Sequence, residues 1–386
     1  MSRLRRIGLL LALVLVGLVA WEPSRVALQT AIMLPNLLGA PIRPLDLFSA
    51  PPLRSAVAYS STAGQPELAE LWLPAGASHE RPAGAMLLVF GVNNVGRNHP
   101  AIVRVAEGLA RSGVAVLVPD SRSMLEGRLR ADDLDKVIAA FQLLAARPEV
   151  DAARVGMVGF SVGGSLALIA AADPRIASRV AWVNAFGAYG DAESYLASVA
   201  AHAYLGPLGE IVAWQPTALA REVFLRLLLD TVADSSDRAL LQQRYGKEIA
   251  SDARVSSDGA LRRKLGSEGG RAVYDLITAG TLPEARRAIA SLPARTRAFI
   301  RAISPVEHLD GLRTRVYLMH EIADHHVPFV ESRGLATAIR ERGHLVTHTE
   351  FRLFDHVQPD RLDVIAAAPE LWKLLWHVDQ LMLETL

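Results

Sequence analysis

The chain contains no cysteine among its 386 residues. This excludes disulfide bonds, thiolate metal sites, a cysteine nucleophile and a lipidated N-terminal cysteine. An excess of charge of one sign is also lacking, because 41 Lys and Arg side chains balance 40 Asp and Glu side chains. Such a balance creates no field that would attract nucleic acid or acidic partners, so we expect no nucleic-acid binding. The sequence also has no internal repeat or low-complexity tract.

The N-terminus has the pattern of a targeting segment. Arg3, Arg5 and Arg6 precede residues 7–21, an apolar run without a charge. A positive flank followed by such a run is typical of a secretory signal or signal-anchor, although the run is short for a bilayer span of about 20 residues. Residues 18–20 form a poor cleavage site, which favours an uncleaved anchor over a cleaved signal. We expect the protein at a membrane, with its folded part outside the cytoplasm (periplasmic or extracellular), or secreted after cleavage.

Residues 22–53 are also apolar, and Pro35, Pro41 and Pro44 interrupt them. Because proline breaks helices, we do not expect this segment to cross a membrane as a regular helix. We expect a linker that lies along the membrane surface or packs on the folded domain.

From residue 54 to residue 190, short apolar runs alternate with amphipathic runs. Strands are predicted at residues 55–60, 68–73, 85–90, 114–118 and 180–184, and helices at residues 100–111 and 134–144. The first two strands are expected to form an antiparallel hairpin. The alternation predicts an α/β fold in which helices cover both faces of a mostly parallel sheet.

The alternation stops at residues 191–303. This region contains no convincing strand but has helical stretches such as residues 217–232 and 283–289. It is too long and too apolar for a linker, so we predict a helical cap inserted into the sheet domain. Further strands at residues 316–320 and 345–354 and a final helix near residues 371–383 complete the core. The core would then comprise residues 54–190 and 304–386.

The most informative segment is residues 155–164, which read Val-Gly-Met-Val-Gly-Phe-Ser-Val-Gly-Gly. An apolar strand ends here in a Gly-x-Ser-x-Gly turn that carries Ser161, and helix-forming residues follow. A strand, a sharp turn with a serine, and then a helix form a nucleophile elbow. The small residues beside the serine allow the chain to turn tightly.

A serine hydroxyl needs a base to remove its proton, and the base needs a carboxylate to hold it. Two predicted strands beyond the elbow lead into loops that carry these groups. Asp324 follows the strand at residues 316–320, and His356 follows the strand that ends near Phe354. Both loops leave the carboxyl ends of strands, the edge where open α/β sheets bind ligands.

Together these features resemble the α/β-hydrolase superfamily, and most closely its dienelactone-hydrolase and prolyl-oligopeptidase-type branch. The similarity covers residues 85–187 and 304–386. It depends on Pro148-Glu149-Val150-Asp151, the elbow, Ser304-Pro305, Asp324-x-x-Val327-Pro328 and Asp355-His356. The resemblance implies Ser161 as nucleophile, His356 as general base and then acid, and Asp324 as the carboxylate that orients the histidine.

The sequence departs from the family pattern at two positions. Phe90-Gly91 and His320-Glu321 stand where the family usually has His-Gly. The first departure leaves the oxyanion donors less well defined. We expect the backbone N–H of Val162 as one donor and that of Val92, or of Asn93, as the other.

Several alternatives remain open. Asp191, which follows the strand at residues 180–184, is the main rival acid, and Glu321 is a weaker one. The three histidines around Asp324 could suggest a metal site, but no distant ligand stands out, so we predict no metal and no organic cofactor. The predicted activity is hydrolysis of a small carboxylic ester through an acyl-enzyme. A peptidase or amidase of the same fold, and a catalytically silent binding protein, are the alternatives.

Overall fold

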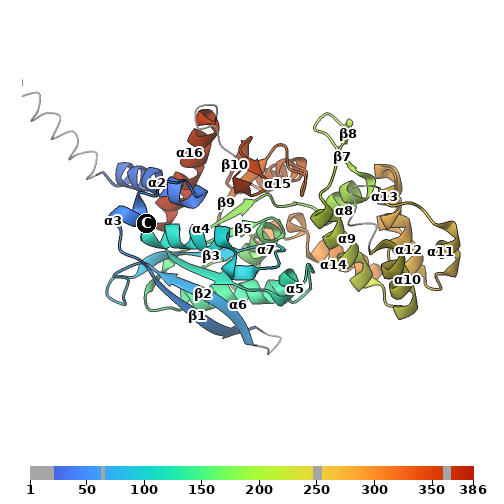
Figure 1. Cartoon of the computed structure of the whole chain (residues 1–386), viewed down its shortest axis with the longest axis horizontal. Helices are drawn as coiled ribbons and strands as arrows, with labels where there is room; N and C mark the ends of the chain where they lie inside the picture. The colour runs from blue at the N-terminus through green and yellow to red at the C-terminus, as the bar shows by residue number, and fades with distance from the viewer. Residues whose placement is uncertain (1–20, 62–65, 247–253, 360–366) are drawn as a thin grey trace, which may run out of the picture.

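The computed structural model describes residues 21–61, 66–246, 254–359 and 367–386. Its centre is an eight-stranded sheet with the order β1-β2-β4-β3-β5-β6-β9-β10 (Figure 1). These strands are β1 (Leu53–Ser60), β2 (Pro66–Leu73), β3 (Ala83–Val89), β4 (Ala115–Pro119), β5 (Val150–Phe160), β6 (Trp182–Phe186), β9 (Arg315–Glu321) and β10 (Val346–Phe351). The β1–β2 and β2–β4 pairs are antiparallel and the other pairs are parallel. This arrangement confirms the predicted α/β fold class.

Helices cover both faces of the sheet, as predicted. On one face lie α2 (Glu22–Leu38), α4 (Pro100–Arg111) and α16 (Ala368–Thr385), and on the other lie α6 (Asp133–Ala145), α7 (Val162–Ala172) and α15 (Val330–Glu341). Side chains alternate along each strand, so the two faces form separate cores. Leu87 and Met157 pack on the α6–α7 side, whereas Leu88 and Val158 pack on the α4–α16 side.

Of the two expectations for residues 22–53, packing on the folded domain is the one that the structure shows, although the segment begins with a helix. Helix α2 continues through Pro35 to Leu38, and Gly39 ends it in the left-handed conformation with φ 71°. Pro35 lies in the last turn, so the helix ends only three residues after it. The short helix α3 (Leu45–Phe48) follows. Val26 and Met33 are buried, so this segment belongs to the folded domain.

Between β6 and β9 the chain forms a predominantly helical region. Its helices are α8 (Ala192–Ala201), α9 (Ala218–Thr231), α10 (Ser235–Tyr245), α11 (Gly259–Lys264), α12 (Glu268–Ile277), α13 (Leu282–Ala290) and α14 (Ala294–Ala302). They gather at the opposite end of the molecule from α2 and α3 (Figure 1). The expectation that this region lacks strands is wrong, because β7 (Ala203–Leu205) and β8 (Ile211–Ala213) form a small antiparallel ribbon. Strands of three residues are too short to give an alternating pattern that the sequence could reveal.

Within the described residues, no helix combines the length and the apolar character that a membrane span requires. The predicted targeting segment lies outside the described residues, apart from Trp21 at its end.

Candidate active site

Ser161 occupies a sharp turn between β5 and α7. Its backbone has φ 55° and ψ −133°, a conformation that L-residues rarely adopt. The turn is possible because the neighbouring glycines let backbones approach each other. A Cβ on Gly159 would lie 2.4 Å from the carbonyl oxygen of Gly163, and a Cβ on Gly163 would lie 2.3 Å from the carbonyl oxygen of Val89. Strained backbone of this kind is typical of functional turns, where the surrounding structure holds it in place.

The structure brings Asp324 and His356 together from two loops at the same edge of the sheet. Nδ1 of His356 lies 2.5 Å from Oδ2 of Asp324. The other ring nitrogen of His356, Nε2, is buried and has no hydrogen-bond partner among the described residues. His356 and Ser161 line the same cavity, so Nε2 is the ring nitrogen left available for a hydroxyl or a substrate there.

The surroundings of Asp324 stabilise its ionised form. Its Oδ1 accepts hydrogen bonds from the backbone N–H groups of His326 (2.6 Å) and Val327 (3.0 Å). Nε2 of His320 lies 3.4 Å from Oδ2. Burial by itself would raise the pKa of Asp324, but the charges and hydrogen bonds of His356 and His320 outweigh it and hold the pKa well below its usual range. Asp324 is therefore a carboxylate at neutral pH and can stabilise an imidazolium at His356.

Glu321, the weaker rival acid, has a different task in the structure. Its Oε2 accepts the backbone N–H groups of Leu353 (2.7 Å) and Phe354 (2.9 Å), and its Oε1 accepts that of Ala323 (3.2 Å). The side chain is buried at 2% exposure. Glu321 thus ties the loop before Asp324 to the loop before His356.

Asp191, the main rival acid, lies at the start of α8. Its Oδ1 accepts the backbone N–H of Glu193 at 2.8 Å, so it caps the helix. Its own N–H donates to Oε2 of Glu331 at 3.1 Å. The carboxylate in contact with His356 is Asp324.

Two further residues shape the space around His356. Gly187 was not predicted from the sequence, and His326 is one of the three histidines noted around Asp324. Gly187 adopts φ 63°, and a Cβ there would lie 2.8 Å from Cε1 of His356. The ring of His326 stacks on that of His356 with centroids 4.5 Å apart. Side-chain atoms of Asp324, His326 and His356 that could act as metal ligands come within 4.8 Å of one another, a spacing that a metal ion could use. The Asp324–His356 hydrogen bond and the ring stacking account for this grouping without an ion.

The loop that follows β3 lies against the elbow. A Cβ on Gly91 would lie 3.2 Å from Cβ of Ser161 and 3.3 Å from the backbone nitrogen of Val162. Val162 is the first residue of α7, so its N–H has no partner within the helix. Val92 and Asn93 line the same cavity as Ser161. The structure therefore places both candidate second donors on the loop that faces the elbow.

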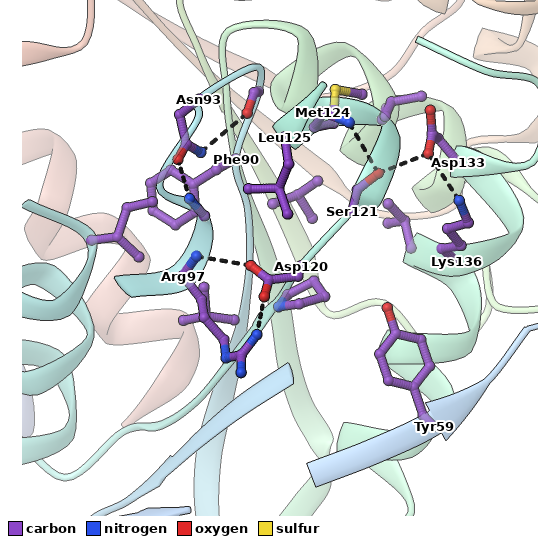
Figure 2. Close-up of a pocket in the computed structure, with 18 residues that line it drawn as sticks. Tyr59, Phe90, Asn93, Arg97, Asp120, Ser121, Met124, Leu125, Asp133 and Lys136 are labelled. Atoms are coloured by element: carbon purple, nitrogen blue, oxygen red, sulfur yellow. Dashed lines mark hydrogen bonds and ion pairs between the residues drawn. The ribbon is translucent and has the colours of Figure 1, made fainter. Parts of the chain in front are cut away.

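Polar contacts around a small cavity of about 30 Å³ hold the loop that follows β3 in place (Figure 2). Oδ1 of Asn93 accepts the N–H of Gly96 at 2.5 Å and that of Val95 at 3.2 Å. Asp120 accepts the backbone N–H of Arg97 at 2.8 Å and also pairs with the Arg97 guanidinium, as the dashed lines in Figure 2 show. These contacts fix the backbone that presents Val92 and Asn93.

Ser161 opens into a cavity of about 280 Å³. Its walls come from the β3 loop, the elbow, α2, α4, α9 and the His356 loop. On α9, Leu219, Ala220 and Val223 line the cavity, whereas Phe224 is buried in the core. The apolar side chains of this helix are therefore divided between the cavity and the core.

No established protein-family model matches the sequence. A curated Mycobacterium tuberculosis protein, provisionally named a phosphoribosyl transferase, is 33% identical over 142 residues, which are 35% of this chain and 30% of that protein. The matched region is thus less than a third of that protein's length.

Solved structures of greater length share the fold. The dipeptidyl peptidase 4 of Porphyromonas gingivalis aligns over 87% of this chain and 36% of its own, with a TM-score of 0.51 and 12% identity. A dipeptidyl aminopeptidase IV from Bacteroides ovatus gives a TM-score of 0.53 at 13% identity, covering 87% of this chain and 36% of its own. A puromycin-hydrolyzing peptidase of Mycobacterium tuberculosis gives 0.51 at 17% identity, covering 87% and 40%. The sheet order, the elbow and these neighbours together show that the chain has the fold of the α/β-hydrolase superfamily.

Proposed function

We propose that the protein is a serine hydrolase that cleaves carboxylic esters through an acyl-enzyme. The observation that carries the proposal is the 2.5 Å contact between His356 and Asp324, which leaves Nε2 of His356 unpartnered in the cavity that contains Ser161. This arrangement supplies a nucleophile, a base and an orienting carboxylate in the chain order that this fold uses.

In the proposed reaction, Oγ of Ser161 attacks the ester carbonyl carbon while His356 takes the hydroxyl proton. The N–H groups of Val162 and Val92 receive the negative charge that develops on the carbonyl oxygen. The C–O bond to the alcohol then breaks, and His356 returns the proton to the leaving alcohol. Water, activated by the same histidine, attacks the acyl-Ser161 ester and releases the carboxylic acid.

Labelling with a fluorophosphonate tests this proposal directly. The wild-type protein should bind the reagent once per chain, whereas Ser161→Ala should not react because it lacks only the nucleophilic oxygen. Ser165→Ala is a matched control: Ser165 is buried one helical turn away and its hydroxyl donates to the carbonyl of Tyr189 at 2.9 Å. Equal labelling of wild type and Ser161→Ala would refute the nucleophile assignment.

A peptidase is the second candidate. The three neighbours described above are named as peptidases, and the same three residues could cleave an amide. Aminoacyl p-nitroanilides, with turnover divided by the labelled fraction, separate the two, because both kinds of enzyme hydrolyse activated p-nitrophenyl esters. Turnover of the anilides would favour the peptidase, and turnover of the matched esters alone would favour the esterase.

We further propose that the hydrolase works at a membrane surface outside the cytoplasm, with residues 1–21 as its anchor. Exposed apolar side chains on helices that pack together support this: Leu28 on α2, Phe48 on α3 and Trp372 on α16 are 54%, 80% and 68% exposed. The full-length chain should stay with membranes after an alkaline wash, and Leu13→Glu with Val16→Glu should release it. Recovery of the uncleaved wild-type chain in the soluble fraction would refute the anchor.

A further inference from the structure

A second cavity lies directly behind the catalytic one, on the face of the sheet that α2, α4 and α16 cover. Its volume is about 130 Å³. The sheet side of its wall contains Met86, Leu88, Val158, Phe160, Phe186 and Met319. The helix side contains Leu34, Leu37 and Leu38 of α2, Val105 and Leu109 of α4, and Leu374, Val378, Leu381 and Met382 of α16. We call this space the α2 channel.

Among the described residues, the side chains that line the α2 channel are apolar except that of Asn184. Both ends of the Asn184 side-chain amide have a partner within the protein. Its Oδ1 accepts from Nε2 of His377 at 3.0 Å, and its Nδ2 lies 3.7 Å from Sδ of Met319. A cavity without hydrogen-bond partners holds water poorly but accepts hydrocarbon.

The α2 channel adjoins the catalytic cavity. Leu37, Val105, Phe160 and Val357 line both spaces. Two of these four flank the reacting groups, because Phe160 precedes Ser161 and Val357 follows His356. An acyl group attached to Ser161 could therefore extend from the catalytic cavity past Phe160 into the channel.

The volume of the channel limits the length of chain that fits. A cavity of about 130 Å³ holds roughly six carbons, because a dry apolar cavity of about 150 Å³ holds benzene. The acyl carbons nearest Ser161 would lie in the catalytic cavity, so a chain of roughly ten carbons would fill both spaces. We propose, on the basis of the esterase function proposed above, that the α2 channel binds the apolar acyl chain of the substrate and that the substrates are esters of medium-chain fatty acids.

Substitutions that fill the channel test this proposal. Val378→Phe on α16 and Leu38→Trp on α2 add volume at half-buried channel positions that do not line the catalytic cavity. With p-nitrophenyl esters from acetate to palmitate, wild type should prefer acyl chains near ten carbons. Each variant should lower the ratio of kcat/KM for decanoate to that for acetate by at least tenfold.

Leu375→Phe is the matched control, because Leu375 is also half-buried on α16 but lines neither cavity. It should leave the ratio unchanged. The proposal is overturned if folded Val378→Phe and Leu38→Trp keep the wild-type chain-length profile, or if Leu375→Phe alters it as much as they do.

A binding measurement separates this proposal from the esterase function on which it rests. Decanoate should bind the full-length Ser161→Ala protein in detergent, and adding Val378→Phe should weaken this binding by at least tenfold, whereas adding Leu375→Phe should not. If wild type hydrolyses no ester but decanoate binds in this way, the proposed activity fails and the channel stands. If esters are hydrolysed but Val378→Phe does not weaken decanoate binding, the channel assignment fails and the activity stands.

Discussion

The imidazole of His326 lies nearly parallel to that of His356, with ring centroids 4.5 Å apart and planes inclined by 18°. Burial, and after it the charge of the neighbouring His356, lower the pKa of His326 to about 4. His326 is therefore neutral near pH 7, and it supports the His356 ring without adding a competing charge. The Nδ1 atom of His326 is buried and has no hydrogen-bond partner among the described residues.

Replacing His326 should reveal how far this contact positions His356. His326→Phe keeps an aromatic face against the imidazole and should retain most of the activity. His326→Ala removes the face and should lower kcat by about fivefold, the equivalent of a ring contact of about 1 kcal/mol. Steady-state kinetics on a short ester check this. Equal losses in both variants would show that stacking is not what matters.

Asp324→Asn should impair turnover far more than Asp191→Asn. An asparagine cannot stabilise the imidazolium and permits the wrong tautomer of His356, and such a change typically costs about 10⁴-fold in kcat. Asp191→Asn removes only a charge from a helix cap that asparagine can also provide. The comparison is made on unlabelled protein with one ester, at equal concentrations of folded chain. A crippled Asp191→Asn enzyme with an active Asp324→Asn enzyme would reverse the assignment of the acid.

Glu321→Gln should destabilise the loops that carry Asp324 and His356. A glutamine has only one acceptor oxygen for the three backbone N–H groups that Glu321 binds. At least one buried donor then loses its partner, at a cost of about 1–3 kcal/mol in the free energy of unfolding. Urea denaturation measures this loss, and a Glu350→Gln variant, whose carboxylate pairs with partly exposed Arg333, is the comparison. We expect kcat to fall in Glu321→Gln as well, because both loops lose their common tether.

Glu331 should make stability depend on pH. Burial raises the pKa of Glu331 to about 7, although hydrogen bonds from Ser194 and the N–H groups of Asp191 and Gly190 oppose this. A carboxyl whose pKa is raised on folding contributes stability that is complete below its unfolded pKa and is lost as the pH rises through 7. Between pH 4.5 and pH 8, wild type should lose about 3 kcal/mol relative to Glu331→Gln. Urea titrations at both pH values check this, and a difference that is constant with pH would contradict it.

Helix α9 offers a test of specificity at the catalytic cavity itself. Val223 lines the cavity and Leu227, one turn later, is buried in the core. Val223→Ser should change the relative turnover of long and short esters by about tenfold with little change in melting temperature. Leu227→Ser should lower the melting temperature and leave the ratio unchanged. If Val223→Ser changed the ratio of long- to short-ester turnover no more than Leu227→Ser does, α9 would not face the substrate.

Local pattern alone determined the framework of this protein. Apolar runs alternating with amphipathic runs predicted the parallel sheet and its covering helices, because each strand and helix must bury its own apolar side chains. The elbow could also be predicted from the sequence, since only small residues at positions 159 and 163 permit the turn at Ser161. Chain order then restricted the partners of Ser161 to a few acids and one well-placed histidine.

The choice among those acids depended on the tertiary structure. Asp324, Asp191 and Glu321 all follow strands, and the sequence alone could not say which carboxylate reaches His356. Strand order decides this, because β10 lies beside β9 and brings their loops together. The same holds for Gly187, His326 and the α2 channel, whose parts come from segments far apart in the chain. Sequence periodicity reports which face of an element is apolar, but only packing determines what that face meets and whether space remains between them.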